Sequence, residues 1–253
     1  MLNPLNHPFL MLLLSLVVFW IAAKIGTVIH GRQKQVDANT IDDFKLILGA
    51  TLTLLGLIIG FTFSMAVSRY DQRKNLEEQE ANAIGTEYSR ADLLPANEAS
   101  SVRYLLKSYL DQRMLFYTTW NAQQLRQIKA QTRKTQDDMW KAVAVPASQQ
   151  PTPVRALVIS GMNDVLNSEG YTQAAWWNRI PTAAWTLMIA IGLFCNVLVG
   201  YVAHSRSGSL LWILPIALSI SLFLIADIDS PGRGVIRVIP QNLQSLASSL
   251  SSH

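Results

Sequence analysis

Residues 54–67 read LLGLIIGFTFSMAV, and residues 68–78 continue as SRYDQRKNLEE. No proline or glycine breaks the passage from the apolar run into the polar run, so one helix is predicted to begin in lipid and continue into water. Counted from Leu46 to Leu94 at about 1.5 Å per residue, it would be roughly 70 Å long, more than twice the thickness of a bilayer's hydrocarbon core. Such a helix indicates a membrane protein with a helical region outside the membrane.

The composition also indicates a membrane protein. Hydrophobic residues make up 50% of the chain and charged residues only 15%, well below the roughly 25% charged residues of soluble domains. The net charge of +4 is small, and the basic residues do not form a patch with interleaved aromatic residues, which excludes nucleic-acid binding. Cys195 is the only cysteine, and no histidine has a second ligand three or four positions away. We therefore expect no disulfide, metal site or other cofactor.

Four apolar segments are long enough to cross a bilayer. They are residues 8–29, 44–67, 181–203 and 210–226. Residues 204–209 alone join the last two, which predicts a helical hairpin. The sequence thus predicts an all-α membrane protein with four transmembrane helices, divided into the first and second helices (1–67), a long helical cytoplasmic insert (68–179), the third and fourth helices (180–229) and a C-terminal cytoplasmic tail (230–253).

The insert is polar but helical in pattern. The pairs Arg73/Glu77 and Lys74/Glu78 predict a solvated face on its first helix. Apolar residues at helical spacing predict one buried stripe in the next. The stripe consists of Val102, Leu105, Leu106, Tyr109, Leu110, Met114 and Tyr117.

Capping and breaking residues predict where the helices begin and end. Thr40 is expected to start the second membrane helix, and Asn97 the helix after the Leu94-Pro95 turn. Two further helices are expected over about residues 123–143 and 154–167. Between them, prolines 146, 151 and 153 are expected in a loop.

With four spans, both termini and the insert share one side of the membrane. Lysine and arginine near the membrane ends are slightly more frequent on that side, which predicts that it is the cytoplasm. That side has Arg69, Arg73, Lys74, Arg179, Arg233 and Arg237, and the other has Arg32, Lys34 and Arg206.

Two rows of residues follow the second membrane helix. Gly49, Gly56 and Gly60 form a small-residue seam, which is typical of close helix packing in lipid. Thr53, Leu57 and Phe61 form an adjacent row. Spacing leaves two interpretations of this row open, an ordinary lipid-facing or core surface and a narrow apolar pore that gates by dewetting.

Acidic residues give no sign of an enzyme. Asp71, Glu77, Glu78 and Glu80 have no serine, cysteine or histidine nucleophile beside them, so we expect no catalysis. Asp227 and Asp229, at the end of the last apolar segment, allow a cation ligand, a salt bridge to Arg69 or Arg73, or a loop cap. A salt bridge or cap is favoured, because calcium would need six or more oxygen ligands.

The order of these features resembles the bestrophin family. Gly60-Phe61 is followed eight positions after Phe61 by Arg69-Tyr70, then by Gln72-Arg73-Lys74, with Asn82 and Arg90 downstream. The run 228–231, Ile-Asp-Ser-Pro, is similar to the family's acidic element after its last membrane helix. Runs 64–73 (SMAVSRYDQR) and 80–86 (EANAIGT) resemble the bacterial bestrophin-like membrane proteins.

The resemblance implies a homopentameric ion channel of the bacterial inner membrane, with lipid and inorganic ions as its other partners. By position, Thr53, Leu57 and Phe61 would be the pore neck and Gly60 the glycine beside it. The cytoplasmic extension of the pore helix would contain Arg69, Tyr70, Asp71 and Arg73, and the loop after the membrane Asp227, Asp229 and Pro231.

Two departures from the family pattern bear on function. Tyr70-Asp71 replaces the paired tryptophans, and Gly232-Arg233-Gly234 stands where animal members have an acidic calcium clasp. Calcium gating is therefore not implied. The alternative to a channel is a non-conducting membrane scaffold or sensor with the same architecture.

Overall fold

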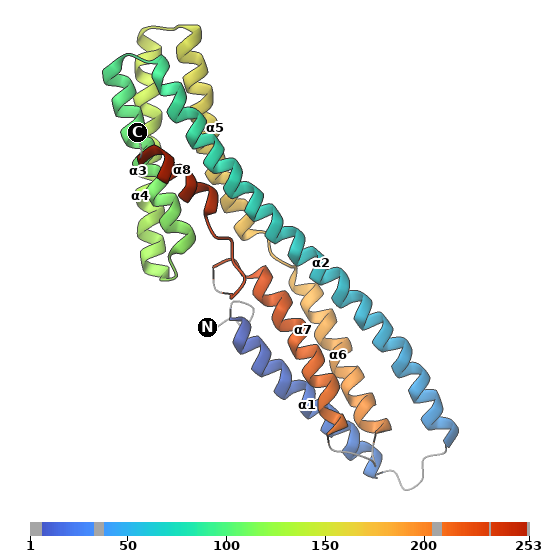
Figure 1. The fold of residues 1–253 in the computed structure, drawn as a ribbon. Helices are drawn as coiled ribbons and strands as arrows, with labels where there is room; N and C mark the ends of the chain where they lie inside the picture. The colour runs from blue at the N-terminus through green and yellow to red at the C-terminus, as the bar shows by residue number, and fades with distance from the viewer. Residues whose placement is uncertain (1–6, 33–37, 204–208, 233, 252–253) are drawn as a thin grey trace. The chain divides into compact units, whose positions relative to one another are not determined.

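The computed structural model describes residues 7–32, 38–203, 209–232 and 234–251, which contain helices and no strands (Figure 1). In chain order the elements are α1 (Pro8–Arg32), α2 (Ala38–Arg90), η2 (Ala91–Leu93), α3 (Ala96–Thr118), α4 (Ala122–Gln149), α5 (Pro153–Trp177), α6 (Thr182–Val202), η3 (Leu210–Trp212), α7 (Ile213–Asp229) and α8 (Gln241–Ser251). Four of the helical stretches are long and apolar enough to cross a membrane. The all-helical class and the four apolar helices are confirmed. Residues 204–208 of the predicted 204–209 connection, Lys34 and Arg233 lie outside the described residues.

The chain forms two compact units. The apolar unit contains residues 1–69 and 179–236, and the polar unit contains residues 70–178 and 237–253. Each is described separately below.

Helix α2 is a single helix of 53 residues, as the unbroken run past Val67 predicts. It begins at Ala38, so the prediction that Thr40 starts it is wrong. The acidic residues that suggested a start lie within its first turns, where the helix dipole favours negative charge. One of them, Asp42, pairs with Lys45 one turn later at 2.7 Å.

In the apolar unit, α1 packs on α6 and α7, and α1 crosses α6 at two glycines. A Cβ added to Gly26 would overlap the carbonyl oxygen of Val197, and one added to Gly200 would overlap that of Ala23. The two backbones are therefore in direct contact, which only glycine permits.

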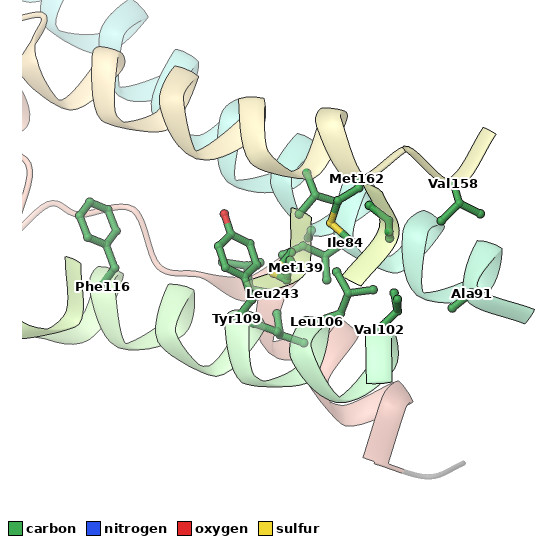
Figure 2. Packing of buried hydrophobic residues seen from close by; sticks show 14 of the residues in the cluster. Ile84, Ala91, Val102, Leu106, Tyr109, Phe116, Met139, Val158, Met162 and Leu243 are labelled. Atoms are coloured by element: carbon green, nitrogen blue, oxygen red, sulfur yellow. The ribbon is translucent and has the colours of Figure 1, made fainter. Parts of the chain in front are cut away.

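The polar unit has its core between the second half of α2 and helices α3, α4, α5 and α8 (Figure 2). Val102, Leu106 and Tyr109 of α3 are fully buried, which confirms the centre of the predicted stripe. Met139 of α4 and Met162 of α5 fill the space opposite them, and neither is exposed.

Three predicted boundaries in this unit are wrong. Helix α3 begins at Ala96 after Pro95, without a side-chain cap, so Asn97 is not its cap. Pro146 lies in the last turn of α4, where its missing N–H removes only one hydrogen bond.

Helix α5 begins at Pro153, the favoured first position, with Thr152 as its cap. It continues through Gly170 to Trp177, because Thr172 and Ala175 of its last turns are buried.

The predicted C-terminal tail, which is rich in serine, contains the helix α8 (Gln241–Ser251). Leu243, Leu246 and Leu250 of α8 recur at helical spacing and belong to the core of the polar unit, while the serines face outward. The Glu77 carboxylate of α2 accepts hydrogen bonds from the Leu243 backbone N–H at 2.9 Å and the Asn242 side-chain amide at 2.7 Å. A carboxylate at this position caps the N-terminus of α8.

Candidate pore helix and the loop after the last span

The row Thr53, Leu57 and Phe61 lies on the side of α2 that points away from its own unit. Leu57 is 55% and Phe61 67% exposed, and Thr53 is exposed as well. Leu55, Thr62 and Ala66 on the opposite side are at most 5% exposed. Within the described residues, the whole row is therefore uncovered.

The hydroxyl of Thr53 is satisfied within the helix. Its Oγ1 donates a hydrogen bond to the carbonyl oxygen of Gly49 at 2.9 Å. A threonine bonded in this way has its donor satisfied, so it can border an apolar space without losing a hydrogen bond.

The glycine seam on α2 has no partner within the described protomer. A Cβ added to Gly49, Gly56 or Gly60 would meet no atom within 4 Å. The glycines that bring the backbones of two membrane helices into contact are instead Gly26 and Gly200, which the sequence did not single out. The available signal was that each interrupts an otherwise apolar helix, as the glycines of α2 also do.

The four extension residues that follow the apolar run have different environments. Arg69 is the last residue of α2 that belongs to the apolar unit, and it lies 3.7 Å from an oxygen of Asp229. Within the polar unit, the hydroxyl of Tyr70 donates to the carbonyl oxygen of Arg237 at 3.3 Å. Asp71 is exposed, whereas Arg73 is 1% exposed.

Asp229, the last residue of α7, contacts the segment just before α6 and the middle of α2. Both of its carboxylate oxygens lie 3.2 Å from the backbone N–H of Ile180, just before α6. Arg179 lies 3.4 Å and Arg69 3.7 Å from the carboxylate. A carboxylate at a helix C-terminus opposes the helix dipole, and these positive partners offset that effect.

Asp227 holds the loop that follows α7. Its two oxygens accept the backbone N–H groups of Val235 at 2.7 Å and Ile236 at 2.8 Å. Gly232, directly after Pro231, has φ of 89°, a left-handed conformation that favours glycine. Of the uses considered for the two aspartates, Asp229 makes the salt bridge to Arg69 and Asp227 caps the loop. No group of three or more metal-ligating side chains occurs among the described residues.

A family model described as a bestrophin-like domain matches residues 9–243. The chain belongs to the bestrophin-like family. Two structures of a bacterial bestrophin homologue from Klebsiella pneumoniae, each carrying one substitution, share the fold. One is 15% identical over 94% of this chain and 99% of that chain, with a TM-score of 0.62. The other is 13% identical over 96% and 97%, with a TM-score of 0.65.

A third solved structure, described as a membrane protein, is 13% identical over 93% of this chain and 98% of that chain, with a TM-score of 0.65. At such identities the likeness shows the fold alone. The comparison with curated proteins found no match.

The bestrophin-like chain also buries one of the two charged pairs that the sequence predicts in solvent. Lys74 and Glu78 are exposed as predicted, but Arg73 and Glu77 are each 1% exposed, so the solvated-face prediction is wrong for that pair. Tertiary contacts decide the difference, because Glu77 caps α8 from the core side of α2.

Glu80 is the centre of a buried polar cluster in the polar unit. It pairs with Arg113 of α3, and its Oε2 accepts hydrogen bonds from the hydroxyls of Tyr117 and Thr172 at 3.4 Å each. Burial alone lowers the pKa of Arg113, but the Glu80 carboxylate more than offsets this and the pKa is raised. Burial, then Glu80, raises the pKa of Tyr117. Arg113 therefore remains charged and Tyr117 remains a donor.

Proposed function

We propose that this bestrophin-like protein is a homo-oligomeric ion channel of the bacterial inner membrane, with Thr53, Leu57 and Phe61 forming its hydrophobic constriction. The main support for the proposal is the exposure of the apolar stretch of α2. Only 11% of its most apolar 18-residue stretch is buried, against 33%, 39% and 50% for the other three candidate spans. The apolar stretch of α2 is therefore the least covered of the four candidate spans within the described residues.

Lipid alone would cover an apolar face, but two features favour other copies of the chain. The exposed face carries the seam of Gly49, Gly56 and Gly60, with open space beside each, and small residues allow neighbouring membrane helices to approach closely. By the sequence resemblance, the row beside this seam would occupy the neck positions of the family. Copies of α2 packed around an axis, five in the bestrophin arrangement, would place that row toward the axis.

In the polar unit, the exposed residues of α2 have a different character. At about 100° per residue, Asp71, Asn75, Gln79, Asn82 and Thr86 share one helix face, and all five are exposed. We propose that this face lines the aqueous cytoplasmic entrance to the pore. An apolar constriction followed by a polar lining suits a conduit that gates by dewetting.

Ion flux through lipid vesicles tests the proposal. Vesicles containing the purified protein are expected to dissipate an imposed salt gradient faster than protein-free vesicles and vesicles with an unrelated helical membrane protein. A stable homo-oligomer that leaves the gradient intact would contradict channel activity and favour the alternative, a non-conducting scaffold or sensor.

The cytoplasmic location of the polar unit has its own test. In a Cys195→Ala background, Ser148→Cys places one exposed thiol at the end of α4. A membrane-impermeant maleimide is expected to label this thiol only after the cells are permeabilised. Labelling of intact cells would reverse the proposed topology without affecting the flux result.

A further inference from the structure

Within the polar unit, α2 turns three carboxylates inward, and one of them lacks the partners of the other two. Glu77 caps α8 and Glu80 pairs with Arg113. Glu87, on the next turns of the same helix, is 0% exposed. Neither of its oxygens has a hydrogen-bond donor among the described residues.

Glu87 lies directly on the backbone of α5. A Cβ added to Gly161 would overlap the Glu87 Oε2 and the Arg90 Nη1. Glycine at this position therefore makes the space for the carboxyl group. The packing encloses the group and excludes water from it, although it offers no donor to an ionised carboxylate.

Two charged groups act on Glu87, one from each helix beside it. Arg90 of α2 has its Nη1 3.8 Å from Oε2, beyond hydrogen-bond distance, and is 29% exposed. Asp164 of α5 adds negative charge. Burial raises the pKa of Glu87 to about 8, with Asp164 adding to the rise and Arg90 opposing it. Desolvation prevails because Arg90 is partly in water, where its charge is screened.

We propose that Glu87 is a proton-binding site of the polar unit, which is occupied at neutral pH and which, on releasing its proton to water in mildly alkaline solution, loosens the packing of α2 on α5. The protonated carboxyl is neutral and fits an enclosed site with few partners. The ionised form brings an incompletely compensated charge into the same space, and the favoured response is separation of the helices and entry of water.

The sign of the stability effect follows from proton linkage. The folded-state pKa of Glu87, about 8, exceeds its ordinary value of 4.5. Between these values the unfolded chain releases the proton while the folded chain keeps it, so stability falls as pH rises. The contribution of Glu87 is fully present below about pH 4.5 and lost above about pH 8.

Infrared titration of the purified protein in detergent tests the proposal. The wild type is expected to show a protonated-carboxyl C=O band that disappears with a midpoint near about pH 8 and is absent from Glu87→Gln. Glu78→Gln, which changes an exposed carboxylate on the same helix, should leave that band unchanged. Arg90→Gln retains Glu87 but removes the opposing charge, so the midpoint should move to higher pH.

Thermal unfolding provides an independent readout. The wild-type melting temperature is expected to fall between about pH 5 and pH 9, and Glu87→Gln should flatten part of that fall. A midpoint below about pH 6 in the wild type, or no change in midpoint on Arg90→Gln, would overturn the proposal. The Arg90→Gln titration decides the matter if Glu87→Gln does not fold.

Discussion

Arg113→Ala is expected to lower the free energy of unfolding of the polar unit by about 3–5 kcal/mol, because it leaves the Glu80 carboxylate buried without its counter-ion. The Arg113 side chain is 1% exposed and that of Glu80 0%, so solvent cannot compensate for the lost partner. Arg113 also lies over the ring of Phe116, 4.5 Å from its centroid, and that stacking would be lost too. Denaturant unfolding in detergent, followed by tryptophan fluorescence, measures the change.

The matched control is Arg126→Ala, which removes an exposed arginine from α4 and should change stability by less than about 0.5 kcal/mol. Replacing both charges, with Glu80→Leu and Arg113→Met, should recover much of the loss, because an apolar pair of similar volume leaves no charge unpaired. Equal effects of Arg113→Ala and Arg126→Ala would show that the cluster around Glu80 does not stabilise the unit.

Phe61→Ala is expected to raise ion flux several-fold in the same vesicle assay. If α2 lines an axial pore, the substitution removes one aromatic ring per subunit from a single level, which widens the constriction and lowers the barrier to wetting. The row faces away from its own unit, so the change should leave the protomer fold intact. Flux per oligomer, normalised to reconstituted protein, is the measurement.

The control must also be an exposed phenylalanine in the apolar unit. Phe194 of α6 is 52% exposed, close to the 67% of Phe61, and Phe194→Ala should leave flux nearly unchanged. Leu54 is less suitable, since it lies only about 20° from Phe61 around the helix. If Phe194→Ala and Phe61→Ala altered flux equally, the neck assignment would fail while the family assignment would remain.

Apolar length and helical periodicity were sufficient to predict the class of this protein. A continuous apolar run can satisfy its backbone in lipid only as a helix, so the four spanning segments could be read from composition. The continuity of α2 from Ala38 to Arg90 followed from the missing breakers after Val67. Apolar length and the absence of helix breakers are local properties of the chain, so tertiary contacts do not change the helices that they predict.

Only the tertiary structure decided which polar residues are buried. Arg73/Glu77 and Lys74/Glu78 have the same spacing, yet the first pair is buried and the second exposed, because only one face of α2 is covered by other helices. The serine-rich C-terminal segment forms a core helix, and Glu77 of α2 caps its N-terminus. Contacts between residues far apart in the sequence produce these differences, so the spacing of residues along one helix cannot predict them.

The glycines show the same division between sequence and structure. Gly26 and Gly56 both interrupt apolar helices, and sequence alone gave them the same meaning. In the structure, Gly26 touches the backbone of α6, while Gly56 borders open space. The sequence by itself determined that the membrane-spanning part of α2 is an apolar helix with a seam of small residues. The fold alone decided that this seam is left uncovered within the described residues, because α1 packs on α6 through other glycines and the seam of α2 meets no neighbouring atom.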